Sequence, residues 1–300
     1  LILNNLEFDH GDIFRDLLDI SRSFSHLLRI VPSDGYVLIN GDDPNLKELS
    51  DAPWTSTINV GLSEGNGLQI TEFSEDSKGS RFGLVWKGNK VMQIDWQMHG
   101  LFNARNLAMA TLASVLMQNI ESGERMNNPD FNPFAFATLP DFSSCTGVKR
   151  RQEILHESEK LIILSDFAHH PTAITGAIES LRARWPDREI IACFEPRSNT
   201  AVTNIFESRF VEALALADVA LLGAIYRAEK IPPENRIDPQ NMIIRINELG
   251  KKGHAFESNQ NLERFLMSSE FSNPSLVVFF SNGSFDGVID RFTDSFERRK

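Results

Sequence analysis

Three clusters of polar residues in the second half of the sequence have side chains suited to binding a charged ligand. They lie at 165–171, 195–200 and 281–284, and each directly follows a short apolar run. Together they offer carboxylates, two adjacent imidazoles, an arginine, hydroxyls and amides, which can hold phosphate, carboxylate or amine groups. If the apolar runs are parallel strands of one sheet, the clusters meet at its carboxyl edge, where ligands bind in such folds.

The second and third clusters suggest recognition of a carboxylate. Arg197 can grip such a group with two parallel hydrogen bonds, although a surface ion pair is the simpler interpretation. Asn282 precedes Gly283, and that pair can equally be an ordinary turn. The candidate substrate-binding residues in these clusters are Glu195, Arg197, Ser198, Asn199, Thr200, Ser281 and Asn282.

The first cluster places Asp166 shortly before the pair His169 and His170. Carboxylate and imidazole are common metal ligands, but adjacent histidines point in different directions, so a shared metal needs unusual backbone geometry. The alternative is that one histidine caps the helix that starts at Pro171 while the other packs.

Two further charged segments are candidates. Asp9 and His10, with Asp12 close by, can ligate Mg²⁺ or another divalent ion, or one of the aspartates can cap the following helix. The run Lys149, Arg150 and Arg151 is the most basic spot in the chain. It can hold phosphates in a cleft between two domains, or it can be a solvated charged surface.

The elements that position these residues divide at a proline- and asparagine-rich stretch at 121–146, which contains Pro129 and Pro140. We therefore predict two domains, 1–146 and 147–300. In the second, apolar runs alternate with amphipathic segments, which predicts an α/β fold with a mostly parallel sheet covered on both faces. In the first, periodicity predicts helices at 12–30 and 103–119 around several short strands.

Composition excludes several classes of protein. Among 300 residues there are 30 basic and 41 acidic ones, and the net charge of −11 disfavours nucleic acid as a partner. No apolar run approaches the ~18 residues of a membrane span. The two cysteines cannot build a disulfide framework, which fits a reducing cytoplasm. Because the sequence opens within a predicted strand and without methionine, we expect it to be the remainder of a longer protein.

Taken in order, four segments resemble the Mur ligases, the ATP-dependent amide-forming enzymes of bacterial cell-wall synthesis. They are Asn5-Leu-Glu-Phe-Asp-His10, Gly100-Leu-Phe-Asn-Ala-Arg-Asn106, Gly147-Val-Lys-Arg-Arg-Gln-Glu153 and Asp166-Phe-Ala-His-His-Pro171. Within the family, 194–200 and 281–283 look like the branch that attaches a preformed peptide to UDP-N-acetylmuramate. The resemblance implies that 1–146 is the end of the central ATPase domain and that 147–300 is the C-terminal Rossmann-like domain. No GxxxxGK[ST] phosphate loop is present, so we expect this polypeptide alone to be inactive.

The resemblance also implies cofactors, substrates and residue roles. ATP and Mg²⁺ are the expected cofactors, and UDP-N-acetylmuramate and the murein tripeptide are the expected substrates, joined through an acyl phosphate. The resemblance implies that His10 binds Mg²⁺, that Asn103 and Asn106 contact the adenine, and that Asp166 contacts the ribose. It implies that Arg151 contacts the phosphates, with Lys149 and Arg150 as weaker candidates, and that His169 and His170 lie near the phosphates or the acceptor. The substrate-binding residues of the second and third clusters are implied to bind the peptide. Phe102 stands where the family usually has histidine, and the first lysine of the chain is Lys47, so a carbamylated lysine soon after His10 is absent.

Three alternatives stay open. One is the same chemistry with L-alanine as the acceptor, which the segment 195–200 should discriminate. Another is a metal-dependent phosphohydrolase that uses Asp9, His10, Asp12, His169 and His170. The last is a nucleotide- or peptide-binding module without chemistry.

Overall fold

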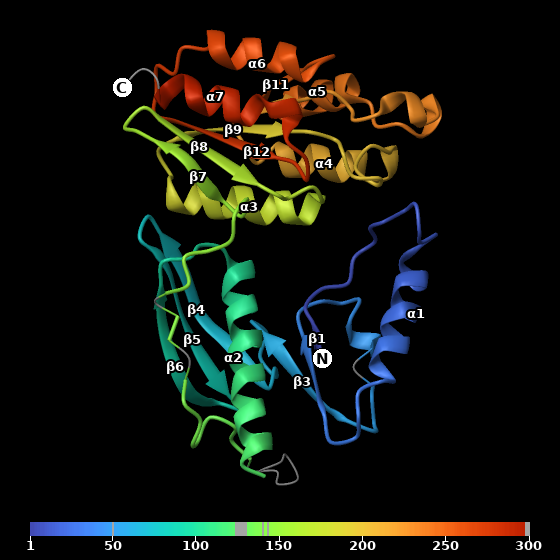
Figure 1. Ribbon diagram of the computed structural model, residues 1–300, viewed down its shortest axis with the longest axis vertical. Helices are drawn as coiled ribbons and strands as arrows, with labels where there is room; N and C mark the ends of the chain where they lie inside the picture. Colours follow the sequence, from blue (N-terminus) through green and yellow to red (C-terminus); the bar gives the residue numbers. More distant parts are fainter. Residues whose placement is uncertain (50, 124–130, 140, 143, 298–300) are drawn as a thin grey trace. The chain divides into compact units, whose positions relative to one another are not determined.

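The computed structural model describes residues 1–300 except 50, 124–130, 140, 143 and 298–300 (Figure 1). Pro129 and Pro140 of the predicted boundary segment lie outside the described residues. Contacts within the chain divide it into two compact units, Leu1–Thr146 and Gly147–Lys300. In the described part, no helix has both the length and the apolar character needed to cross a bilayer.

The second unit is built on a six-stranded sheet with the strand order β11-β10-β9-β12-β8-β7. All neighbours are parallel except the antiparallel pair β7 and β8. The strands are β7 (Glu153–Glu157), β8 (Leu161–Asp166), β9 (Glu189–Phe194), β10 (Val219–Leu222), β11 (Lys252–Ala255) and β12 (Ser275–Phe280). The chain moves outward from β8 to β11 and then returns to insert β12 between β8 and β9, which makes this position the topological switch point.

Helices cover both faces of this sheet, which confirms the predicted α/β class (Figure 1). They are α3 (Pro171–Arg184), α4 (Glu207–Leu214), α5 (Pro239–Glu248), α6 (Asn259–Ser268) and α7 (Val288–Glu297). Leu262 of α6 and Phe292 of α7 pack against Val277 and Phe279 of β12 in one core cluster. Helix α4 contacts both α3 and α5. Because β8 and β12 are buried along their whole length, most of the residues in their sequences are apolar and follow one another without interruption.

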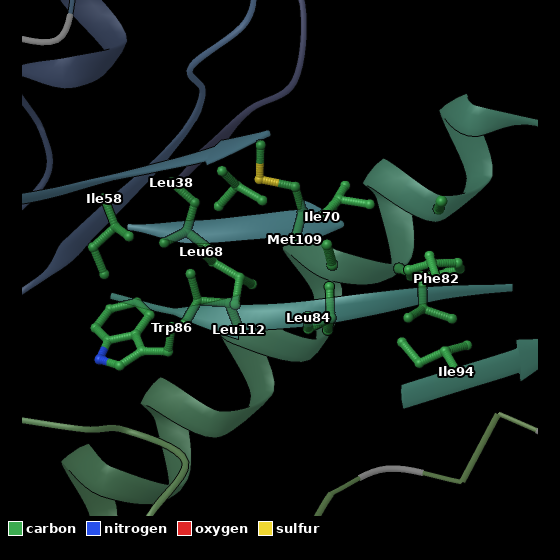
Figure 2. Close-up of a cluster of buried hydrophobic side chains, with 14 of the residues drawn as sticks. Leu38, Ile58, Leu68, Ile70, Phe82, Leu84, Trp86, Ile94, Met109 and Leu112 are labelled. Carbon is green, nitrogen blue, oxygen red and sulfur yellow. The ribbon is translucent and has the colours of Figure 1, made fainter. Parts of the chain in front are cut away.

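The first unit contains a sheet whose strands follow sequence order from β1 to β6. The strands are β1 (Ile2–Leu3), β2 (Tyr36–Asn40), β3 (Ser56–Gly61), β4 (Leu68–Asp76), β5 (Gly79–Trp86) and β6 (Asn89–Trp96). The first four are mutually parallel, and the last two pairings are antiparallel. Helix α2 (Leu101–Glu121) places Met109 and Leu112 against the strand residues Leu68, Leu84 and Trp86 (Figure 2).

Helix α1 (Leu17–Leu28) is shorter than the helix predicted at 12–30. It begins at Leu17 because the side chain of Asp16 accepts a hydrogen bond from the backbone of Asp19 and so caps the first turn. The capping role considered for Asp9 or Asp12 therefore belongs to Asp16.

Candidate functional site

The three polar clusters of the second unit lie side by side at the carboxyl edge of its sheet. Phe280 at the end of β12 pairs with Asp166 of β8 and with Phe194 of β9. Just beyond the strands, the backbone of Ser281 donates to Asp166 O (3.1 Å) and that of Glu195 donates to Phe280 O (3.1 Å). The clusters therefore converge at the switch point, the position where ligands bind in open α/β sheets.

Glu195 is the buried centre of this edge, with 1% of its surface exposed. Its Oε2 accepts hydrogen bonds from the hydroxyl of Ser281 and from the backbone of Phe285 (3.3 Å). Its Oε1 accepts from Asn259 Nδ2 (3.1 Å) and lies 3.4 Å from Arg197 Nη1. Since both oxygens are already engaged by protein donors, the contribution of Glu195 to the site is to hold its neighbours in place.

Arg197 presents a positive charge beside the end of β9. Its side chain is 23% exposed, and its guanidinium lies 3.8 Å from the centre of the Tyr226 ring. A Cβ added at Gly283 would come within 2.2 Å of Arg197 Cδ, so the glycine lets the arginine lie directly on the β12 loop. A guanidinium fixed by an aromatic ring and a carboxylate, and still partly open to solvent, is suited to bind a ligand carboxylate.

The remaining predicted peptide residues differ in how accessible they are. Ser198 Oγ accepts a hydrogen bond from the backbone of Ala201 (3.1 Å), and Thr200 is buried. Asn199 is exposed on the loop. The Oδ1 atom of Asn282 is buried and has no hydrogen-bond partner among the described residues, which leaves it as an acceptor that a ligand can satisfy.

Asp166 is the last residue of β8 and lies at this carboxyl edge of the sheet. Its oxygens accept hydrogen bonds from the backbones of Ala168 (2.7 Å) and Gln152 (2.9 Å). Burial raises the pKa of Asp166 above its usual value, while these two hydrogen bonds and the charges of Arg151 and Arg150 oppose that rise.

The three basic residues before β7, Lys149, Arg150 and Arg151, have different surroundings. Arg150 adopts a left-handed backbone (φ 58°) and donates to the carbonyl oxygens of Ser281 and Gly283, so it clamps the β12 loop. Lys149 and Arg151 are exposed. The Arg151 guanidinium lies 5.2 Å from the Phe167 ring centre, beside the Asp166 carboxylate that it influences. Arg151 is therefore the member of the run best placed to meet a phosphate near Asp166.

The two histidines point into different surroundings. His169 Nδ1 lies 2.9 Å from Phe167 O, and its ring meets the Phe167 ring edge to face. His170 occupies the N-cap position of α3 without a side-chain capping bond, and its ring packs on Phe206. Both are half-buried at the ligand edge.

In the first unit, His10 is exposed and has a left-handed backbone (φ 54°) stabilised by a bond from its N–H to the Asp9 carboxylate (2.7 Å). Across the described residues, no group of three His, Cys, Asp or Glu side chains is arranged to hold a metal ion.

The N-terminal turn of α2 carries the other two nucleotide candidates. Asn103 Nδ2 donates to His99 O (2.7 Å), and Asn106 accepts from Asn4 Nδ2 (2.7 Å) just beyond β1. Gly100 caps the helix with φ 91°, and an added Cβ there would come within 2.3 Å of the Phe102 ring.

Sequence reasoning missed several residues that organise these edges. Asp42 was not among the candidates, yet it accepts hydrogen bonds from the backbones of Leu62 and Ser63 and lies 3.5 Å from Arg105 Nη2. Tyr226 and Asn259 were not singled out, although they support Arg197 and Glu195. The position of Asp42 directly after a buried strand was the one available signal.

Comparison with known proteins matches both units to one family. The Mur ligase middle domain matches residues 1–114, and the Mur ligase, glutamate ligase domain matches residues 150–283. The UDP-N-acetylmuramate–L-alanyl-γ-D-glutamyl-meso-2,6-diaminoheptandioate ligase of Escherichia coli K12 is 34% identical over 100% of this chain and 60% of its own length. The UDP-N-acetylmuramate–L-alanine ligase of Desulfitobacterium hafniense is 26% identical over 94% of this chain and 59% of its own length.

Solved structures agree on the fold. A murein peptide ligase from Psychrobacter arcticus aligns with a TM-score of 0.62 at 26% identity, over 98% of this chain and 56% of the other. An alanine ligase from Thermotoga maritima aligns with a TM-score of 0.71 at 18% identity over 100% of this chain and 60% of the other. The chain thus spans about 60% of the length of these relatives. With both units matched in order by its domain models, the chain belongs to the Mur ligase family.

Proposed function

We propose that this chain is part of an ATP-dependent ligase that joins UDP-N-acetylmuramate to the tripeptide L-alanyl-γ-D-glutamyl-meso-diaminopimelate in the recycling of cell-wall peptides. In this proposal, 1–146 belongs to the central ATPase domain and 147–300 is the C-terminal domain that receives the peptide. The reaction takes place in the cytoplasm, in keeping with the free cysteines Cys145 and Cys193.

The observation that carries the proposal is the Arg197 site at the carboxyl edge of the second unit. Its guanidinium is fixed by Tyr226 and Glu195 but remains partly exposed, as recognition of an anionic peptide requires. The similarity supports the tripeptide as acceptor, since the E. coli relative named for it is 34% identical, against 26% for the D. hafniense alanine ligase.

The reaction proceeds in two steps. An oxygen of the lactoyl carboxylate forms a bond to the γ-phosphorus of ATP while the bond to the bridging oxygen breaks, which gives an acyl phosphate and ADP. The amine of the peptide then forms a bond to the acyl carbon, loses a proton, and expels inorganic phosphate. Bringing a carboxylate to a polyanion requires cations, and Arg151 is the exposed cation that this unit offers beside Asp166.

The donors of the described residues fit the two cofactors differently. His10 is a single exposed imidazole, and no group of three metal-binding side chains occurs in the described part, so these residues do not by themselves complete a Mg²⁺ site. For the nucleotide, we propose Asn103 and Asn106 as contacts of the adenine, Asp166 as the acceptor for ribose hydroxyls, and Arg151 as the phosphate contact. His169 and His170 border the same edge, near the phosphates or the acceptor.

A substrate-resolved assay of the full-length enzyme tests the proposal. The coding sequence upstream of Leu1 should encode a phosphate loop, and the complete protein should release phosphate only with ATP, UDP-N-acetylmuramate and an acceptor together. Mass spectrometry should find the tripeptide product in preference to the L-alanine product. Preference for L-alanine would assign the alternative acceptor, and phosphate release without an acceptor or product would refute the ligase assignment.

A further inference from the structure

A pocket of about 600 Å³ opens beside the Arg197 site, between the start of α6 and the segment that leads into α7. Its lining includes Asn259, Glu263 and Arg264 of α6, Asp286 of the segment after β12, and Arg291 of α7. Of these residues, Asn259 also supports Glu195.

The pocket and the Arg197 site share one chain of hydrogen bonds. Asn259 is 4% exposed, and its amide nitrogen donates both to Glu195 Oε1 (3.1 Å) and to Asp286 Oδ2 (2.9 Å). Its oxygen accepts from the backbone of Ala224 (3.0 Å), so the amide cannot turn without losing bonds on both sides. Because Glu195 also contacts Arg197, one chain of hydrogen-bonded side chains connects the Arg197 site with the lining of this pocket.

Two of the four charged groups in the pocket are committed to each other. Arg291 makes paired hydrogen bonds to Glu263 (2.8 and 2.7 Å), and this arginine lowers the pKa of the Glu263 carboxyl. The charges of this arginine and this carboxylate therefore largely cancel within the pocket lining. Arg264 and Asp286 make no ion pair among the described residues, although the charge of Arg264 also acts on Glu263 and that of Asp286 on Arg291.

Arg264 and Asp286 are both exposed at the rim. Arg264 makes only a long hydrogen bond to Asn261 (3.5 Å), and in the described part it joins no ion pair. Asp286 is held in a left-handed conformation (φ 53°, ψ 33°), a state that costs a non-glycine residue about 1 kcal/mol or more. The fold thus keeps a carboxylate at this position despite a backbone cost.

We propose that this pocket binds the distal amino-acid group of the diaminopimelate residue, with Arg264 on its carboxylate and Asp286 on its ammonium. The inference rests on the proposed function and extends it to the third residue of the acceptor. An arginine and an aspartate that line one pocket, and that join no ion pair among the described residues, match the two charges of a zwitterion. An extended peptide of three residues spans about 10 Å, so the end of the acceptor reaches well beyond a carboxylate held by Arg197.

The test compares three acceptors in the full-length enzyme: the diaminopimelate tripeptide, the same tripeptide with lysine in the third position, and the dipeptide L-alanyl-γ-D-glutamate. Lysine keeps the distal amine but lacks the distal carboxylate. For the wild type, we expect KM to be lowest with the diaminopimelate tripeptide. Arg264→Gln should raise that KM by roughly tenfold or more, in line with loss of a charged hydrogen bond, and should leave the KM for the lysine tripeptide and for the dipeptide unchanged.

Asp286→Asn should raise the KM for both tripeptides and not for the dipeptide. Asparagine tolerates the left-handed backbone and can still accept the Asn259 bond, so this variant should fold normally. Lys252→Gln is the control, because this exposed lysine is the first residue of β11 and so lies at the amino end of the outermost strand of the same sheet. Equal losses with all acceptors, or no loss with any, would overturn the pocket assignment. Failure of the wild type to use any peptide would instead overturn the proposed function.

Discussion

Glu195 and Ser281, which are 86 residues apart in the sequence, are joined by a hydrogen bond from the serine hydroxyl to the buried carboxylate. The same hydroxyl accepts a hydrogen bond from the backbone of Gly283 (2.7 Å). This link fixes the loop after β12 against the end of β9. The surface on which Arg197 rests is therefore shaped by a residue that a ligand does not reach.

Glu195→Gln should disturb both stability and peptide binding. The amide replaces one acceptor oxygen with a donor, so it cannot keep all the bonds from Ser281, Asn259 and the Phe285 backbone. Loss of such a buried bond costs about 1–3 kcal/mol in the free energy of unfolding. Denaturant unfolding and the KM for the peptide measure the two effects. Glu189→Gln at the other end of β9 is the control, and an equal loss there would contradict a role specific to the site.

Gly283→Ala should act through Arg197. The new methyl group would come within 2.2 Å of Arg197 Cδ and Nε, which forces the guanidinium off the loop. We expect the KM for the peptide to rise roughly tenfold or more while the KM for ATP stays unchanged.

A double-mutant cycle separates this effect from a general disturbance of the loop. Arg197→Ala alone should weaken use of the tripeptide more than ATP binding. Added to Arg197→Ala, the change Gly283→Ala should then cost little more. Additive losses in the double variant would show that the alanine acts elsewhere.

The architecture of the second unit could be predicted from its sequence for a physical reason. Strands buried on both faces, such as β8 and β12, leave uninterrupted apolar runs, and the residues that follow them must reach one edge. The edge strand β7 was not predicted, because among its five residues only His156 is buried. Helix α1 was predicted too long, because apolar spacing continues past the Asp16 cap.

The site could be predicted only in its local parts. Arg197 and Asp166 follow strands and so were marked by position. The support that Asn259 gives to Glu195 spans 64 residues and depends on how α6 packs beside β9, which no local pattern encodes. Arg150 was grouped with Arg151 by charge alone, although its left-handed backbone turns it onto the β12 loop.

Arg151→Met should change how stability depends on pH. Burial already raises the pKa of Asp166, and Arg151 opposes that rise, so its removal should raise the pKa further. A carboxyl whose pKa is higher in the folded than in the unfolded state contributes most stability below its unfolded pKa and loses that contribution as pH rises through the folded pKa. The variant should therefore lose more stability than the wild type as pH rises above about 3.8, the usual pKa of an aspartate.

Denaturant unfolding at a series of pH values, with carbon NMR of the Asp166 carboxyl, checks this sign. Lys149→Met is the matched control, since this exposed lysine is not among the charges that act on Asp166. A parallel shift of the two stability curves at all pH values would contradict the coupling of Arg151 to Asp166.

Gly100→Ala tests the entry to α2, where Asn103 is proposed to meet the nucleotide. Gly100 has φ 91°, and an added Cβ would come within 2.3 Å of the Phe102 ring. Gly65 has nearly the same φ of 94°, but an added Cβ there meets nothing within 4 Å. Both alanine variants bear the cost of the backbone conformation, about 1 kcal/mol or more, and only Gly100→Ala adds the clash. We expect losses of about 2–4 kcal/mol against about 1 kcal/mol by denaturant unfolding, and weaker ATP binding for Gly100→Ala alone. Equal losses would show that the glycine serves the backbone and that Phe102 has room to move.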